Sequence, residues 1–215
     1  MAITAAMVKE LREMTGAGMM DCKKALTETN GDMDAAVDVL KKSGAAKMEK
    51  KQSRIAAEGI ARVAVNGNVA VVAEVNSETD FVAKNETFQE FVQTVADTAL
   101  ASDLNGGANG EDIEALLATN GLSDLLVEKT ATIGEKLSVR RFAKVTGDAV
   151  ASYIHGGGRI GVVIAADGAS DDAAKEALTN IAMQVAAMNP QYISRNDISA
   201  EELAKIKEIT IDSAL

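Results

Sequence analysis

The sequence predicts an α+β protein in which N-terminal helices precede a core of antiparallel strands packed with helices. Apolar residues recur at helical spacing up to about residue 50, strand-like runs begin near Ile60, and glycine-rich turns separate those runs. With 215 residues, of which 47% are hydrophobic and 25% charged, the chain can bury one large core or two modest ones plus a small module. We expect a three-helix docking module over residues 1–53, a first half of the core over 54–140 and a second half over 141–215.

Three helices are expected in the N-terminal module, each ended by glycine or by an Asn-Gly pair. Thr4 and Asp32 precede the first and third helices, where their side chains can cap free backbone N–H groups. A unit of about 50 residues supports only a marginal core. The expected helices run from just after Thr4 to residue 15, from 19 to 29 and from 33 to 43, with Gly44 closing the third.

The period of the apolar pattern changes from helical to strand-like near Ile60. Apolar runs flank Asn66-Gly67-Asn68, and Asn-Gly between such runs is the strongest short-range signal for a β-hairpin. Residues 86–101 then show helical spacing, and the glycine-rich residues 105–110 predict a flexible surface loop. Two short helices are expected over residues 111–119 and 123–133.

Three further strands are expected to form an antiparallel meander in the second half of the core. A long helix over residues 171–188 follows, and it ends before Pro190, which disfavours helical geometry in the preceding residue. A last amphipathic helix begins at Ser199 and runs to Leu215. The three strands are expected over residues 137–145, 149–154 and 160–166.

A faint internal repeat relates the two halves of the core. Residues 67–72, followed by a helix, resemble residues 158–163, which are also followed by a helix. Any strand, turn and helix would produce a similar pattern, so the repeat suggests two related α+β halves without establishing them.

Charge and composition exclude several functional classes. A net charge of -10 and a pI near 4.7 argue against a protein that binds the phosphate backbone of nucleic acids. The single cysteine, Cys22, cannot form an internal disulfide and fits a reducing cytosol. No run of about 18 apolar residues could span a bilayer, and the N-terminus lacks an export signal. We expect a cytoplasmic protein that binds neither nucleic acid nor membranes directly.

The glycine-rich residues 156–161 formally satisfy the dinucleotide-binding pattern G-x-G-x-x-G. That site requires a helix after the glycines, whereas a strand is expected here, so a hairpin turn or a close backbone approach is favoured. His155, the only histidine, is either a structural turn residue or a contact for a partner. Cys22 lies beside two lysines that could lower its thiol pKa, although a small packing residue is the simpler interpretation. We expect no enzymatic activity, no cofactor and no metal site.

Residues 76–85 are the most informative segment, because they place a carboxylate and a large aromatic side by side on a strand-to-helix turn. Two interpretations of Asp80 and Phe81 remain open. Phe81 could fold back as a core anchor while Asp80 caps the next helix. Alternatively, a rigid scaffold holds Phe81 outward as a wedge for another protein.

Methionines concentrate in the first module, where they can fill gaps in a small core. Met19 and Met20 are adjacent, and neighbours on a helix cannot both face one core. At least one of them is therefore expected to reach a groove or a partner.

Three ordered motifs resemble the bacterial elongation factor Ts family. They are Leu11 to Leu26 (LREMTGAGMMDCKKAL), Glu78 to Lys84 (ETDFVAK) and Ser152 to Gly156 (SYIHG). The family is the guanine nucleotide exchange factor for elongation factor Tu, the GTPase that delivers aminoacyl-tRNA to the ribosome. The resemblance implies a ubiquitin-associated-like three-helix module before an α+β core, and a translation factor that is not an enzyme.

The resemblance also implies roles for particular residues. Thr79, Asp80, Phe81 and Val82 would enter elongation factor Tu near its switch region and help to dislodge Mg²⁺, so that GDP leaves faster. The remaining partner-binding residues implied by the family are His155 and Gly156 near the phosphate-binding loop, and Met19, Met20 and Lys23 in the docking module.

Two further expectations accompany the resemblance. Members of this type usually continue past the helix that begins at Ser199, so this chain, which ends at Leu215, is interpreted as C-terminally shortened. The alternative function is a stand-alone protein-binding module that acts through its N-terminal helices. A nucleotide-binding enzyme that uses the glycine run is a third, less favoured interpretation.

Overall fold

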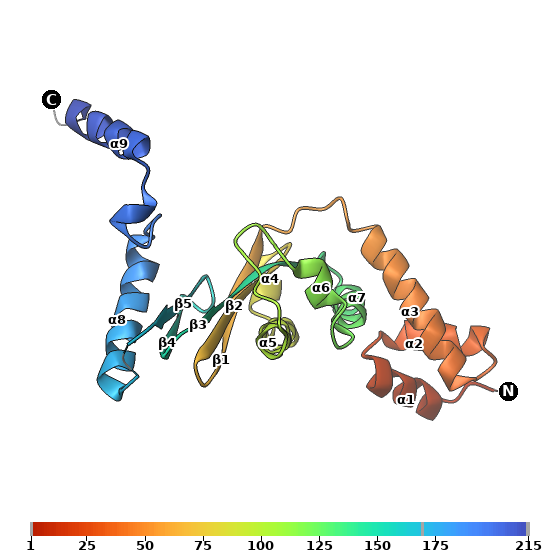
Figure 1. Cartoon of the computed structure of the whole chain (residues 1–215). Coiled ribbons are helices and arrows are strands. Elements are labelled where there is room, and N and C mark those ends of the chain that lie inside the picture. Colours follow the sequence, from red (N-terminus) through yellow and green to blue (C-terminus); the bar gives the residue numbers. More distant parts are fainter. Residues whose placement is uncertain (1, 169, 214–215) are drawn as a thin grey trace.

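The computed structural model describes residues 2–168 and 170–213. Figure 1 shows a three-helix module at one end, a central sheet with its helices, and a second small sheet followed by two long helices at the other end. The chain is therefore α+β with antiparallel sheets, which confirms the predicted fold class.

The N-terminal module contains the three predicted helices. The side chains of Thr4 and Asp32 each accept a hydrogen bond from a backbone N–H three residues further on, so both predicted caps are confirmed. Leu11, Cys22 and Leu26 are fully buried and form the centre of the small core. The helices are α1 (Ala5–Thr15), α2 (Met19–Glu28) and α3 (Met33–Glu49).

The predicted end of the third helix at Gly44 is wrong, because α3 continues to Glu49. Gly44 is buried where α3 packs against α7 (Leu122–Ile133). A Cβ atom on Gly44 would lie 3.2 Å from Cγ1 of Val127, so glycine here permits two helices to approach closely. The sequence pattern could not distinguish this use of glycine from a helix stop.

A three-stranded antiparallel sheet forms the centre of the molecule, in the order β1-β2-β3. Asn66 pairs with Val69, which leaves Gly67 and Asn68 as a two-residue turn and confirms the predicted hairpin. The predicted helix over residues 86–101 is also confirmed, and it packs on this sheet as α5. The strands are β1 (Glu58–Asn66), β2 (Val69–Ser77) and β3 (Ser138–Thr146), and the helix is α5 (Glu86–Ala101).

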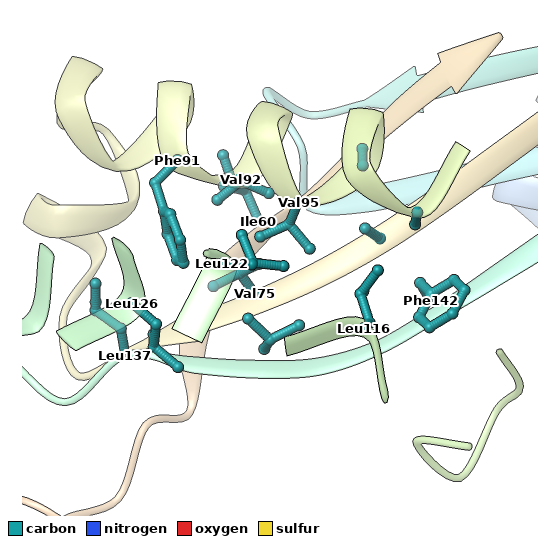
Figure 2. Close-up of a cluster of buried hydrophobic side chains, with 14 of the residues drawn as sticks. Ile60, Val75, Phe91, Val92, Val95, Leu116, Leu122, Leu126, Leu137 and Phe142 are labelled. Atoms are coloured by element: carbon teal, nitrogen blue, oxygen red, sulfur yellow. The ribbon is translucent and has the colours of Figure 1, made fainter. Parts of the chain in front are cut away.

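The main hydrophobic core lies between this sheet and the helices that follow it. Figure 2 shows Phe91, Val92 and Val95 of α5 pointing toward the sheet, where Ile60 and Val75 are buried. The short helix α6 (Ile113–Leu117) and α7 complete the core. The buried side chains that α6, α7, β3 and the segment before β3 add to this core are Leu116, Leu122, Leu126, Leu137 and Phe142.

The loop over residues 105–110 is bound to the sheet, in contrast to the flexible loop that the sequence predicts. The Asp112 carboxylate accepts the backbone N–H groups of Asn105 and Gly106, at 3.3 and 3.0 Å. Gly107 donates its N–H to the carbonyl of Phe142 at 2.8 Å. The Asp112 bonds fix the conformation of the loop, and the Gly107 bond attaches it to β3, where Lys144 also donates its N–H to the carbonyl of Asn105 at 2.9 Å.

The predicted three-stranded meander is wrong. β4 (Ala149–His155) and β5 (Ile160–Ala166) pair with each other in a separate two-stranded sheet, whereas β3 pairs with β2. Alternating apolar residues identify a strand but carry little information about its partner. Strand β3 also runs through residues 140 and 141, so the expected boundary between the two halves of the core falls inside a strand.

The β4–β5 hairpin packs on the face of the central sheet opposite α5. A Cβ atom on Gly161 would lie 2.8 Å from Cγ2 of Val72 and 2.9 Å from Cβ of Ala61. Both neighbours alternate along their strands with residues that face the main core. The hairpin is in turn covered by α8, which buries Leu178 against Ala149 and Ala151.

The last two helices begin within one residue of their predicted starts. Asp171 caps α8 (Asp172–Met188), which ends at Asn189, directly before Pro190. Ser199 caps α9 (Ala200–Asp212), and a 3₁₀ turn over Arg195–Asp197 lies between them. Residues 214–215 of the predicted last helix lie outside the described residues. Each hairpin, β1–β2 and β4–β5, is thus followed by a helix that packs on it, which is the arrangement that the internal repeat suggests.

Candidate functional site

The segment after β2 forms one helical turn, α4 (Asp80–Ala83), directly before α5. The cap of this turn is Thr79, whose hydroxyl oxygen accepts the backbone N–H of Val82 at 3.4 Å. The buried Ser77 hydroxyl donates to the carbonyl of Thr79 at 3.1 Å. The alternative in which Asp80 caps the helix is therefore wrong, because Asp80 is its first residue.

The four residues Thr79 to Val82 divide into two pairs. Thr79 is half-buried in a hydrogen-bonded cap, and Val82 is half-buried against the main core. The Asp80 side chain is partly exposed, at 45%, and Phe81 is 81% exposed. The interpretation of Phe81 as a core anchor is wrong, and Ala83 fills the buried position instead.

Asp80 belongs to an exposed ion pair on this turn. Its Oδ2 atom lies 2.7 Å from Nζ of Lys84. The hydrogen bond and the charge of Lys84 lower the pKa of the Asp80 carboxyl, and the positive charge of Arg159 lowers it further. Asp80 is thus a carboxylate at neutral pH, within electrostatic reach of the β4–β5 turn.

The loop between α7 and β3 holds the segment before α4 through two carboxylates. Glu135 accepts the backbone N–H groups of Glu78 and Thr79, both at 3.0 Å, and the hydroxyl of Thr79 at 2.6 Å. Glu78 in turn accepts the backbone N–H of Lys136 at 2.5 Å and pairs with Arg54 at 3.2 Å. Sequence reasoning missed Glu135, because it lies more than 50 residues away along the chain. No local pattern marks such a contact.

The β4–β5 turn presents His155 at its exposed beginning. The Tyr153 hydroxyl lies 3.0 Å from Nδ1 of His155, and the two rings are 5.9 Å apart. The next three glycines all have positive φ, at 59°, 70° and 106° for Gly156, Gly157 and Gly158. Strand β5 follows them, which confirms the hairpin interpretation over a dinucleotide-binding loop.

Gly158 is the point at which this turn contacts the central sheet. Its carbonyl accepts the backbone N–H of Ala61 at 2.7 Å, and a Cβ atom would lie 2.9 Å from Cβ of Ile60. The close backbone approach predicted for this glycine run is therefore confirmed. Since α4 also contacts β1, the fold brings the exposed residues of α4 and the His155 turn to the same strand.

The exposed residues of the N-terminal module lie apart from these two elements. Met19 and Met20 on α2 are 59% and 74% exposed, so both reach solvent, and Lys23 is exposed on the same helix. Cys22 is fully buried, and burial raises the pKa of its thiol, contrary to the lowering that its lysine neighbours suggested. The module contacts the core through α3 and α7 (Figure 1).

A groove of about 600 Å³ lies between the module and α7. Met14, Val37, Leu40 and Val127 supply much of its apolar lining. Within residues 2–168 and 170–213, no group of three or more His, Cys, Asp or Glu side chains could hold a metal ion. No helix in this part of the chain is long and apolar enough to cross a membrane.

A model of the elongation factor Ts family matches residues 78–215, which is more than half of the chain. The chain belongs to the elongation factor Ts family. The match begins at Glu78 and so includes α4, the α7–β3 loop and the β4–β5 turn. The three-helix module precedes it. Membership in the elongation factor Ts family gives this chain a role in translation elongation as a nucleotide exchange factor rather than a catalytic enzyme.

Proposed function

We propose that this chain catalyses the release of GDP from elongation factor Tu in the cytoplasm, and that it binds both the GDP-bound and the nucleotide-free state of that partner. The observation that supports this most strongly is Phe81, which is 81% exposed on a short helix whose base is fastened to the main core. An exposed aromatic on a fixed scaffold has the properties of an interface anchor. Asp80 places a negative charge beside it.

The proposed mechanism uses these exposed residues as a wedge. Thr79 and Val82 hold α4, while Asp80 and Phe81 enter the partner near its switch region and displace the groups that bind Mg²⁺. That ion belongs to the nucleotide site of the partner, where it bridges phosphate and protein oxygens. Moving its ligands removes a large favourable interaction from bound GDP. His155 and Gly156 are proposed to press near the phosphate-binding loop of the same partner.

The energy required exceeds what one side chain supplies. Accelerating GDP release by about a thousandfold requires a barrier lower by about 4 kcal/mol. Several contacts must therefore hold the strain, over an interface of roughly 800 Å² or more per partner. The exposed Met19, Met20 and Lys23 are proposed to provide docking contacts at a second place on the partner. Reciprocity then requires that incoming GTP weakens the binding of this chain.

The first prediction concerns the wedge. We expect Asp80→Ala combined with Phe81→Ala to slow GDP release by about tenfold or more at saturating concentrations of the chain, because both side chains are proposed to act on the partner in the exchange step. Stopped-flow release of fluorescent GDP from elongation factor Tu measures this rate. The melting temperature should change little, because both residues face solvent.

Ile55→Ala is the matched control, because Ile55 is 82% exposed and lies outside α4. It should leave the release rate unchanged. Release at the wild-type rate by the double variant would exclude the wedge. No acceleration of GDP release by the unaltered chain would exclude the exchange function and favour a protein-binding module.

A further inference from the structure

Glu135 makes an unusual set of hydrogen bonds for a half-buried carboxylate. One oxygen accepts two consecutive backbone N–H groups, those of Glu78 and Thr79, at 3.0 Å each. The other oxygen accepts the Thr79 hydroxyl at 2.6 Å. Bonds from neutral donors to a carboxylate are stronger than those between neutral groups. All three attach the same two residues, which lie between the end of β2 and the start of α4.

Helix α4 needs such support from outside, because it comprises only four residues. A single helical turn fixes several backbone dihedral angles for very few hydrogen bonds, so it is unfavourable by itself. Its direction is therefore set by its cap together with the packing of its inward side chains on the main core. That cap is Thr79, which bonds to Val82 through the same hydroxyl that donates to Glu135. Glu135 itself is fixed by the following residue, since Lys136 donates its backbone N–H to Glu78.

We propose that Glu135 is a positioning residue for nucleotide exchange, which sets the direction of Phe81 through Thr79 and α4. The inference rests on the proposed wedge function. Glu135 does not touch the partner in this proposal. Its carboxylate holds the cap of α4 while the aromatic ring is pressed against a partner that resists being opened. Without the carboxylate, contact between Phe81 and the partner would reorient α4 rather than displace groups in the partner.

The test compares Glu135→Ala with the unaltered chain. We expect the rate of GDP release at saturating concentration to fall about tenfold or more, with little change in the concentration that gives half of that rate. Amide hydrogen exchange at residues 78 and 79 should accelerate, because both N–H groups lose their acceptor. The release rate of Glu135→Gln should lie between those of Glu135→Ala and the unaltered chain. Its carbonyl oxygen still accepts N–H groups, but its amide nitrogen cannot accept the Thr79 hydroxyl.

Asp112→Asn is the matched control. Asp112 also accepts two consecutive backbone N–H groups with one oxygen, and it lies in a different loop, outside the proposed contact surfaces. It should leave the release rate unchanged. If the Glu135→Ala variant unfolds below the assay temperature, Glu135→Gln is used as the test instead. A wild-type rate of GDP release by Glu135→Gln would then overturn the proposal.

A double-mutant cycle separates positioning from general destabilisation. In a Phe81→Ala background, Glu135→Ala should slow release by a much smaller factor, because of the two exposed side chains that α4 directs only Asp80 remains. An equal slowing with and without Phe81 would overturn the proposal and assign Glu135 a merely structural role. If Phe81→Ala slows release but Glu135→Ala does not, only this inference fails. If Phe81→Ala itself has no effect, the wedge fails, and the inference with it.

Discussion

Single residues around α4 divide between those that hold the backbone and those that are exposed and proposed to contact a partner. Thr79 and Val82 face inward, whereas Asp80 and Phe81 face outward. Such a division is expected around an exposed functional group, because residues whose hydrogen bonds support the backbone cannot also contact a partner. Glu78 shows how tightly this support is built, since its carboxylate bonds both to Lys136 and to Arg54.

The loss of folding stability at acid pH should depend in part on Glu78. The backbone N–H of Lys136 and then Arg54 lower the pKa of its carboxyl. A carboxylate with a lowered pKa stabilises the fold above its unfolded pKa of about 4.3, and this stability is lost as the pH falls through the folded pKa. We expect Glu78→Gln to be less stable than the unaltered chain at pH 7, and the difference to shrink at acid pH.

Urea denaturation from about pH 7 to about pH 3 measures this difference in the free energy of unfolding. Glu10→Gln, which removes an exposed carboxylate of α1, is the charge-matched control. A difference between Glu78→Gln and the unaltered chain that stays constant over the whole pH range would contradict the expectation.

At this scale the sequence predicts the chemistry of a residue better than its environment. It singles out Asp80 and Phe81, yet the choice between a core anchor and an exposed wedge depends on the packing of Ala83 and Val82. Glu135 could not be found at all, because its partners are more than 50 residues away. The opposite holds for Thr4 and Asp32, whose capping partners are three residues away. Local sequence therefore predicts contacts within one helical turn, but it does not predict contacts between loops that are distant along the chain.

Helices and strands are likewise predicted correctly where they depend on local sequence, and not where they depend on distant partners. The hairpin at Gly67 and helix α5 match their predictions, because turn chemistry and apolar period are local properties. The pairing of β3 with β2 could not be predicted, since the residues between them form α4 to α7 and bring the strand back. The glycines show both outcomes. Gly158 marks a close approach, as expected, whereas Gly44 lies inside a helix.

The element-scale prediction concerns the turn between β4 and β5. We expect Gly158→Val to displace this turn from β1, because its Cβ atom would lie 2.9 Å from both Cβ of Ile60 and Nη1 of Arg62. Displacing the turn moves His155 as well, so GDP release should slow by about threefold or more together with a lower melting temperature.

Gly157→Ala is the control for backbone conformation. Gly157 also has a positive φ, of 70°, but a Cβ atom there meets nothing within 4 Å. Its cost should be limited to the conformational penalty, about 1 kcal/mol. Stopped-flow GDP release and thermal melting are measured on both variants. An equal effect of the two substitutions would show that turn strain, rather than contact with β1, is what matters.

Across the whole molecule, the two surfaces proposed for docking and for exchange are joined by a tight helix contact. The three-helix module presents Met19 and Met20, and the core presents Phe81 and His155. The two parts meet where α3 packs on α7, and Lys136 also bonds to the carbonyls of Gln52 and Arg54 in the connecting segment. If both surfaces bind the partner as proposed, their linkage raises the effective concentration of the second contact once the first has formed.

Gly44 offers a test of this linkage, because it lies at the contact between α3 and α7. A Cβ atom would lie 3.2 Å from Cγ1 of Val127 and 3.7 Å from Cβ of Ala131, so a leucine cannot be accommodated without separating the helices. We expect Gly44→Leu to raise the concentration that gives half-maximal GDP release by about fivefold or more, since overpacking costs about 1–3 kcal/mol. The maximal rate should change little, because Asp80, Phe81 and Glu135 are all retained.

Gly44→Ala is the graded control. Its methyl group makes one tight contact with a side chain, and the higher helix propensity of alanine offsets that by up to about 1 kcal/mol. It should therefore behave like the unaltered chain. Titrating the rate of GDP release against the concentration of each variant separates docking from exchange. A lower maximal rate for Gly44→Leu at an unchanged half-maximal concentration would mean that the module acts on the exchange step, because the chain would still dock normally while failing to release GDP.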